Sequence, residues 1–321
     1  MTNAVLVTGA FGYLGGRIAA SLTKVANYRL FLGSRTPPID PPAWLPSGKP
    51  VQLDLENAES LCAACARVTH IIHLAATNEI DSEADPERAL LTNGLGTLKL
   101  LRAAERAGVK RFIYFSTAHV YGSPLSGNIT ENTLPRPVHP YAITHRAAED
   151  FVLAARRRKT IEGAVIRLSN GLGYPIQPQV DRWTLVGNDL CRQAILQKKL
   201  TLRSSGLQKR DFIALSDVAR AALHMLELPE SELGNGLFNL GGQCSMRIVD
   251  LAERIKYRCS VVLHYSPAIV RPAAAADETS PDLDYRIDKL RATGFALQGD
   301  LNHEIDGTLA LCRQVFQKEP S

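Results

Sequence analysis

The feature that most constrains the fold is a glycine-rich segment between a short apolar run and a helical pattern near the start of the chain. Residues 4–7 read Ala-Val-Leu-Val, and residues 8–15 read Thr-Gly-Ala-Phe-Gly-Tyr-Leu-Gly. Gly9 permits a tight turn, Gly12 permits close approach to a phosphate, and Gly15 permits close packing of helix and strand. The segment therefore predicts a strand–turn–helix unit that holds the pyrophosphate of a dinucleotide at the helix N-terminus.

Strand-like and helical patterns alternate through the first half of the chain. Strands that alternate with helices are typical of parallel β-α-β units. We therefore expect an α/β fold with a doubly wound parallel sheet of the Rossmann type. The expected strands are 4–7, 29–32, 51–53, 70–74, 111–115 and 163–166, and the expected helices are 12–26, 57–66, 86–107 and 140–158.

The alternation weakens after about residue 170. We expect residues 1–169 to form the dinucleotide-binding domain and residues 170–321 to form mostly a smaller C-terminal substrate-binding lobe over the carboxyl edge of the sheet. We leave open that some segments of this lobe return to the Rossmann sheet. Residues 36–50 contain six prolines and predict a stiff surface loop. Further helices are expected at 187–197, 216–226 and 248–255.

Composition excludes several classes of protein. The 321 residues are 45% hydrophobic and 21% charged, as in ordinary globular proteins. The net charge of +5 is too small for a nucleic-acid-binding pattern, and no run reaches the ~18 apolar residues of a membrane helix. The N-terminus lacks the pattern of a signal peptide. We therefore expect a cytoplasmic protein without nucleic-acid or membrane partners.

The cysteines do not indicate a disulfide scaffold or a metal site. Six cysteines are too sparse for such a scaffold in a chain of this length. Cys62 and Cys65 form a single Cys-x-x-Cys, with no second pair and no nearby histidine. This spacing alone favours ordinary thiols, and we expect no metal.

A basic residue stands where the nucleotide is usually discriminated. In such units an acidic residue about 20 positions after the glycine turn binds the ribose 2′-hydroxyl of NAD. Here Arg35 occupies that distance, and the nearest carboxylate is Asp40. A guanidinium suits a 2′-phosphate, which favours NADP; the alternative is that Arg35 stacks on the adenine and NAD is bound. The cofactor-binding residues expected up to this point are Gly9, Phe11, Gly12, Tyr13, Leu14, Gly15, Arg35, Asp54, Leu55, Leu74, Ala75 and Ala76.

Further motifs follow in order along the chain. They are His-Leu-Ala-Ala at 73–76, Asn93 with Gly96-Thr97, Ser-Thr-Ala-His-Val-Tyr-Gly at 116–122, Pro-Tyr-Ala-Ile-Thr-His at 140–145, Arg-Leu-Ser-Asn at 167–170, Arg-Asp-Phe at 210–212 and Phe-Asn-Leu-Gly at 238–241. With the glycine turn, these motifs resemble the extended short-chain dehydrogenase/reductases, a family of nucleotide-sugar epimerases, dehydratases and ketoreductases. The resemblance implies hydride transfer with NAD(P)(H) at a carbon of a nucleotide-activated sugar.

The resemblance also assigns roles to residues. Thr117 would hydrogen-bond the reacting sugar oxygen, and Tyr141 would be the general acid/base on that oxygen. In the family, a lysine four residues after the tyrosine lowers the phenol pKa and approaches the cofactor's ribose; here that position is His145. The resemblance places Asn93, Ser116, Tyr141 and His145 near the cofactor, and Thr117, Ala118, His119, Asn170 and Arg210 near the substrate.

Histidine at position 145 leaves three interpretations open. It is shorter than lysine and largely neutral at pH 7, so it lowers the Tyr141 pKa less. His145 is a weaker replacement in a slower enzyme, or another group or a fixed water completes the proton relay. In the third interpretation the chain is an NAD(P)-binding regulatory or partner protein with little turnover.

Other positions narrow the reaction. Family dehydratases carry an Asp-Glu pair after the threonine, where this chain has Ala118 and His119. We therefore expect epimerisation, keto reduction or alcohol oxidation, and not dehydration. Reduction of a non-sugar ketone is an alternative.

Several candidate residues keep a structural alternative. His119 contacts substrate or packs in a loop, and Arg210 clamps a diphosphate or pairs with Asp211 at the surface. Asn170 contacts substrate or caps a turn, and Asn93 bonds backbone near the active site or lies on a helix surface. The helices expected at 86–107 and 140–158 are apolar on more than one face, and the resemblance implies that they form the contact of a homodimer.

Overall fold

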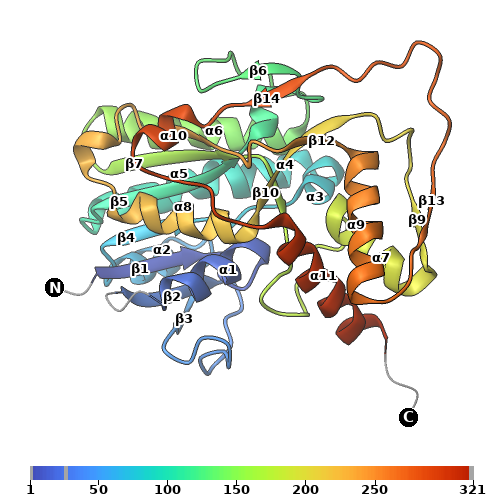
Figure 1. Ribbon diagram of the computed structural model, residues 1–321. Coiled ribbons are helices and arrows are strands. Elements are labelled where there is room, and N and C mark those ends of the chain that lie inside the picture. Colours follow the sequence, from blue (N-terminus) through green and yellow to red (C-terminus); the bar gives the residue numbers. More distant parts are fainter. Residues whose placement is uncertain (1–2, 25–27, 318–321) are drawn as a thin grey trace.

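Seven parallel strands form the central sheet of the computed structural model, which describes residues 3–24 and 28–317 (Figure 1). The strands are β1 (Asn3–Thr8), β2 (Tyr28–Ser34), β3 (Lys49–Gln52), β4 (His70–His73), β5 (Arg111–Thr117), β7 (Glu162–Leu168) and β11 (Leu237–Leu240). Their order across the sheet is β11-β7-β5-β4-β1-β2-β3, and every neighbouring pair is parallel. The predicted doubly wound α/β fold is confirmed.

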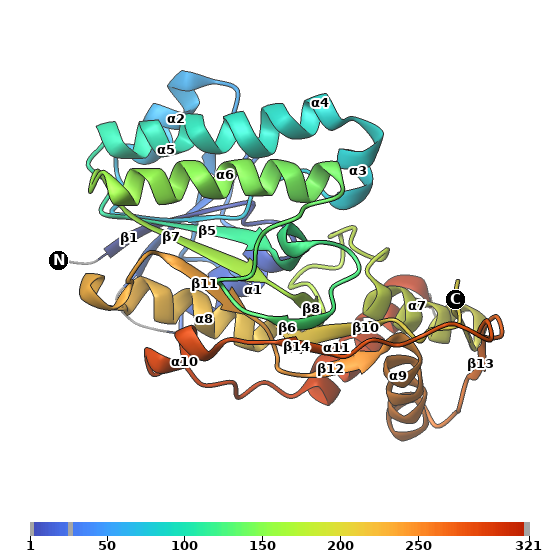
Figure 2. The same ribbon diagram turned by 90° about the horizontal axis from the view of Figure 1, so that it is seen from above.

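Helices cover both faces of the sheet, so its strands are apolar on both sides. Helices α2 (Ala58–Cys65), α5 (Thr97–Arg106) and α6 (Pro140–Arg157) cover one face, and α1 (Tyr13–Leu22) and α8 (Leu215–Glu227) cover the other (Figure 2). The interior strand β1 shows the alternation. Val5 and Val7 pack in the core beneath α1 and α8, whereas Leu6 packs in the opposite core, and all three are fully buried. Burial on both faces accounts for the continuous apolar runs of the sequence.

The helix expected at 86–107 is interrupted. It consists of α4 (Pro86–Ala89), the π-helical segment η1 (Leu90–Gly96) and α5. Asn93 lies in the middle of the π-helical segment and is fully buried. Apolar periodicity cannot reveal a widened turn of this kind, which often occurs at functional sites.

A second lobe lies beyond the carboxyl edge of the sheet (Figure 1). Its core packs α7 (Val186–Gln197), α9 (Ile248–Val262) and α11 (Leu301–Phe316) against one face of a three-stranded sheet. Two segments of the second half, α8 and β11, belong instead to the Rossmann layer. The remaining elements are β8 (Asn170–Leu172), β10 (Lys209–Ala214) and β12 (Ser245–Arg247) of the three-stranded sheet, the pairs β9 (Lys199–Thr201) with β13 (Ala268–Val270) and β6 (Gly127–Ile129) with β14 (Leu283–Tyr285), and the short helices α3 (Glu79–Ala84), η2 (Ala118–Tyr121), η3 (Glu230–Glu232) and α10 (Asp288–Ala292).

The sequence predicts neither a membrane-spanning helix nor a metal site, and both points can be examined in the described residues. Within 3–24 and 28–317, no helix combines the length and the apolar character needed to cross a membrane. The same part of the chain holds no group of three or more His, Cys, Asp or Glu side chains arranged for a metal ion. Cys62 is exposed on α2, whereas Cys65 is buried, and burial raises the pKa of its thiol to about 12.

The expected helix 12–26 ends at Leu22 in the structure, and its residues 25 and 26 lie outside the described ranges.

Candidate active site

A cavity of about 500 Å³ lies where the carboxyl edge of the sheet meets the second lobe. One wall comes from the glycine turn and the ends of β2, β4 and β5, and the opposite wall comes from β8, β10 and the segment before α7. The first turns of α6 contribute Tyr141 and His145. Of the residues expected from the sequence, the cavity is lined by Gly9, Gly12, Tyr13, Leu14, Gly15, Arg35, Asp54, Leu55, Leu74, Ala75, Ala76, Ser116, Thr117, His119, Tyr141, His145, Asn170 and Arg210.

The glycine turn leaves no room for side chains. Gly9 has a φ of +64°, and a Cβ on it would lie 3.2 Å from the backbone nitrogen of Ala75. A Cβ on Gly15 would lie 2.7 Å from the carbonyl carbon of Gly9. No side chain caps the N-terminus of α1 at Gly12, so the first N–H groups of this helix are available to a ligand. This bare backbone cradle at a helix N-terminus fits the pyrophosphate of a dinucleotide.

The far end of the cavity carries the side chains expected near the adenosine. Arg35 follows β2 and is exposed, and the described residues include no carboxylate in a salt bridge with it. Asp54 follows β3 and accepts a hydrogen bond from the backbone nitrogen of Glu56 at 3.0 Å. Glu56 itself pairs with Arg88 at 2.6 Å. A guanidinium therefore lines the cavity at the end of β2, where the sequence analysis expects the residue that distinguishes NADP from NAD.

Three expected residues do not line the cavity. Phe11 packs edge-on against Trp44, and Ala118 is buried behind the end of β5. Asn93 accepts hydrogen bonds from the backbone nitrogen of Thr77 at 2.8 Å and from its hydroxyl at 3.1 Å, and its amide donates to Thr144 at 3.0 Å. Asn93 thus ties the loop after β4 to helix α6. Any contact of these three residues with a ligand stays a prediction.

The expected catalytic residues Thr117, Tyr141 and His145 all line this cavity. Thr117 ends β5, and Tyr141 and His145 lie one turn apart on α6, whose start is fixed by Pro140 and by His139 as N-cap. The rings of Tyr141 and His145 are 4.2 Å apart between centroids, and His145 Nδ1 lies 2.9 Å from the backbone oxygen of Tyr141. The sequence spacing therefore does bring these side chains together.

The site contains little positive charge near the phenol. Burial raises the pKa of Tyr141, Glu79 raises it further, and Arg182 lowers it. Burial lowers the pKa of His145 to about 4, so its imidazole is neutral at pH 7. A neutral imidazole does not lower the phenol pKa as a lysine ammonium would.

Glu79 and Arg182 are cavity residues that the sequence analysis missed. Glu79 begins α3, Arg182 lies in the segment between β8 and α7, and their side chains form an ion pair at 3.2 Å across the two lobes. Although burial opposes its ionisation, Arg182 holds the pKa of Glu79 below the usual value. The two residues are 103 positions apart, so no local spacing indicates this pair.

His119 belongs to a cluster of aromatic rings beside the phenol. Its ring lies 5.4 Å from that of His139, which is 6.2 Å from the ring of Tyr141. Burial lowers the pKa of His119 to about 4, and its Nδ1 is buried with no hydrogen-bond partner in the described part of the chain. His119 therefore lines the cavity as a neutral side chain.

The substrate-side candidates have different surroundings. The Asn170 amide donates to the backbone oxygen of Asp211 at 2.9 Å, which links β8 to β10. The carboxylate of Asp211 accepts from the backbone nitrogens of Gly242 and Cys244, both at 2.8 Å, and does not pair with Arg210. The polar contact described for Arg210 is a long one to Gln208, at 3.5 Å. Arg210 is thus left with donors facing the cavity.

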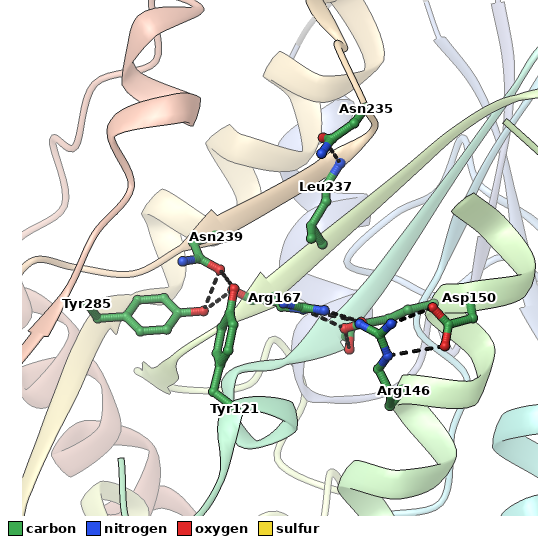
Figure 3. Close-up of polar contacts among 10 residues, drawn as sticks. Tyr121, Arg146, Asp150, Arg167, Asn235, Leu237, Asn239 and Tyr285 are labelled. Atoms are coloured by element: carbon green, nitrogen blue, oxygen red, sulfur yellow. Dashed lines mark hydrogen bonds and ion pairs between the residues drawn. The ribbon is translucent and has the colours of Figure 1, made fainter. Parts of the chain in front are cut away.

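A buried polar network lies behind the site (Figure 3). Glu149 on α6 accepts from Ser116 at 2.6 Å and from Arg167 at 2.6 Å, and both charged side chains are almost completely buried. Tyr285 donates to the backbone oxygen of Arg167 at 2.8 Å, and its neighbour Tyr121 donates to Asn239 at 2.7 Å. These contacts connect β5, α6, β7, β11 and β14, and so fix the strand that carries Ser116 and Thr117 relative to α6.

Comparisons with known proteins agree with this arrangement. The pattern of the NAD dependent epimerase/dehydratase family matches residues 5–241. A dTDP-D-glucose 4,6-dehydratase from Mus musculus is 30% identical over 78% of this chain and 71% of its own, and a UDP-glucose 4-epimerase from Azospirillum brasilense is 29% identical over 74% and 72%. We expected from the sequence that the reaction is not a dehydration. Because one of these relatives is a dehydratase, the comparisons do not support that expectation.

Solved structures share the fold. UDP-glucuronic acid 4-epimerase from Bacillus cereus, in complex with UDP-glucuronic acid and NAD, has a TM-score of 0.79 at 23% identity and covers 98% of this chain and 100% of its own. RMD from Pseudomonas aeruginosa, complexed with NADPH, has a TM-score of 0.75 at 23% identity, with 98% and 99% covered. The similarity extends over both lobes.

Proposed function

The chain belongs to the NAD-dependent epimerase/dehydratase family, and from this premise we propose that it is an enzyme acting on a nucleotide-activated sugar. The observation that carries the proposal is the cavity in which the glycine cradle, Thr117 and Tyr141 face one space. A nicotinamide dinucleotide bound in this cradle supplies the acceptor or donor of a hydride. Both lobes contribute to the walls of the cavity, so we place the dinucleotide on the side of the glycine turn and the sugar nucleotide on the side of β8 and β10.

The chain's own residues handle the proton. As phenolate, Tyr141 takes the proton of the reacting hydroxyl in the oxidation direction, and as phenol it returns that proton in the reduction direction. Thr117 hydrogen-bonds the same oxygen. Arg210, which has no carboxylate partner in the described part of the chain, holds the diphosphate of the substrate. Asn93 and Glu149 contribute by fixing α6 against the loop after β4 and against β5.

Among the reactions of the family, epimerisation or keto reduction fits this site best. The positions after Thr117 hold Ala118, which is buried, and His119, which is neutral. Neither supplies the carboxylic acid that an elimination of water needs there. Glu79 is a carboxylate in the same cavity, so the product analysis must include dehydration.

The test is a product analysis with purified protein. We incubate it with NAD or NADPH and a panel of UDP- and dTDP-sugars and their 4-keto forms, and identify products by mass spectrometry and NMR. We expect an epimer or a reduced sugar, and a loss of roughly 10²–10⁴-fold in rate for Tyr141→Phe at saturating dinucleotide. A product lighter by one water identifies a dehydratase, and full activity of Tyr141→Phe contradicts the proposed mechanism.

We propose that the preferred dinucleotide is NADP. The support is Arg35, an exposed guanidinium at the end of β2 that lines the cavity. Arg35→Ala should weaken NADP binding by roughly 10- to 100-fold, the effect of losing hydrogen bonds from a charged group, and leave NAD binding nearly unchanged. Calorimetric titration with both dinucleotides measures the two effects. Equal losses for NAD and NADP contradict the preference and indicate stacking on the adenine.

We also propose a homodimer that forms through α6 and the π-helical segment. Leu91 and Leu95 on η1 and Ile143 and Phe151 on α6 are exposed apolar side chains on two helical segments that pack together. Phe151→Asp should convert a dimer into a monomer in sedimentation velocity at micromolar concentration. Leu196→Asp, at an exposed leucine on α7 in the other lobe, is the control and should leave the dimer intact. A monomeric wild type overturns the proposal.

A further inference from the structure

The hydrogen bond of His145 fixes which of its ring nitrogens carries the proton. Nδ1 lies 2.9 Å from the backbone oxygen of Tyr141, and a carbonyl oxygen can only accept. Nδ1 must therefore be the donor. Because burial keeps the imidazole neutral at pH 7, it has a single ring proton, and Nε2 is left with a lone pair.

Nε2 is the part of His145 that faces the ligand space. The residue lines the cavity although only 2% of its surface is exposed. Nε2 makes no hydrogen bond to the described residues. It is also absent from the fully buried side-chain atoms that lack a partner, so part of its surface is accessible from the cavity. An acceptor is thus available in the cavity, one helical turn from the phenol of Tyr141.

We infer that His145 accepts a hydrogen bond through Nε2 from a ribose hydroxyl on the nicotinamide side of the dinucleotide. The inference rests on the proposed function, since it concerns how that cofactor is held. A lysine at this position would donate to the ribose and bring a positive charge. His145 reverses the direction of the hydrogen bond and brings no charge, so the ribose hydroxyl must be the donor.

His139, on the same helix, provides a matched internal control. Its Nδ1 lies 3.3 Å from the backbone nitrogen of Ala142, which can only donate, so this Nδ1 is an acceptor. Backbone geometry therefore assigns opposite roles to the Nδ1 atoms of two histidines that lie six residues apart in the sequence.

The first experiment reads the tautomer by long-range ¹H–¹⁵N NMR of the ¹⁵N-labelled protein at pH 7, with signals assigned from His139→Gln and His145→Gln. We expect a protonated Nδ1 and an unprotonated Nε2 in His145, and an unprotonated Nδ1 in His139. Addition of NADP should shift the Nε2 signal of His145 while leaving it unprotonated. A protonated Nε2 in His145, with or without the dinucleotide, overturns the inference.

The second experiment tests the ribose contact by calorimetry. His145→Leu should weaken NADP binding by roughly two- to twelvefold, the range expected for one neutral hydrogen bond. NADP analogues that lack the 2′- or the 3′-hydroxyl of the nicotinamide ribose should be tested in parallel. One analogue should bind the wild type as much more weakly as His145→Leu binds NADP. The same analogue should bind His145→Leu with no further loss of affinity. Additive losses with both analogues overturn the inference. Because neither readout uses a sugar substrate, failure of the proposed reaction would leave both measurements interpretable.

Discussion

The two halves of helix α6 differ in how they carry charge. The first half, from His139 to His145, places the rings of Tyr141 and His145 at the cavity, and burial disfavours the charged forms of both side chains. The second half holds Arg146, Glu149 and Asp150, whose charges are paired with one another or with Arg167 (Figure 3). One helix thus combines a cavity-lining segment poor in charge with a structural segment that takes part in a buried ion pair.

The difference shows that charges on α6 stabilise the framework, whereas the charges that shift the pKa of Tyr141 lie on other elements. The first half holds the neutral His145, and the positive charge that lowers the pKa of Tyr141 comes from Arg182 in the other lobe. In the second half, the Glu149–Arg167 pair acts only on the framework, because it connects α6 to β5 and β7. The phenol therefore depends on charges that come from outside its own helix.

The largest expected effect is on stability and comes from removing the buried ion pair in the second half of α6. Glu149→Ala leaves the guanidinium of Arg167 buried without its partner, and should lower the free energy of unfolding by about 3–5 kcal/mol. Urea unfolding followed by circular dichroism measures this value. Asp150→Ala is the matched control, because the Asp150–Arg146 pair lies at the surface and should contribute less than about 1 kcal/mol. Equal effects of the two substitutions would mean that burial does not distinguish the pairs.

A smaller effect should follow when the first half receives a charge. In His145→Lys the ammonium stabilises the phenolate, so the titration midpoint of Tyr141 should fall by roughly one pH unit or more. Tyrosine ¹³Cζ NMR measures it, with Tyr141→Phe to identify the signal. An unchanged midpoint would show that position 145 does not control ionisation of the phenol. His145→Gln, which adds no charge, is the control.

The smallest effect concerns the ion pair across the two lobes. Glu79 raises the pKa of Tyr141, so Glu79→Gln should lower it, and the activity that depends on phenolate should extend to lower pH. Arg182 has the opposite effect, so Arg182→Gln should move the same limb of the pH–rate profile to higher pH. Each shift should be roughly half a pH unit, as expected for a charge in a solvated cavity. Shifts of the same sign for both variants would contradict the assignment.

Local patterns predicted much of the fold and of the cofactor side of the site. Six strands of the main sheet and helix α6 were expected from apolar runs and from Pro140, and the structure places them close to those ranges. The glycine turn was also predicted from a local pattern, since its three glycines lie within seven residues and their steric roles depend on near neighbours in the chain. The proximity of Tyr141 and His145 follows from their spacing of one helical turn.

Long-range features could not be predicted in this way. The Glu79–Arg182 pair joins segments from two lobes, and the π-helical segment around Asn93 is too short for apolar periodicity to distinguish it from an α-helix. The apolar runs predict no strand of the main sheet beyond residue 166, whereas β11 pairs with β7 in parallel register. A strand of four residues in the second half is recognisable as part of the sheet only when its partner is known.

The position of β11 and α8 has a consequence for the integrity of the molecule. The chain leaves the Rossmann layer after β7, builds part of the second lobe, returns to supply α8 and β11, and then leaves again. The lobes are therefore interleaved, and a fragment that ends at residue 169 would lack the edge strand beside β7 and the helix that packs on α1. Neither half is a self-contained folding unit, so the two lobes should melt as one cooperative body, even though the cavity between them resembles a boundary between domains.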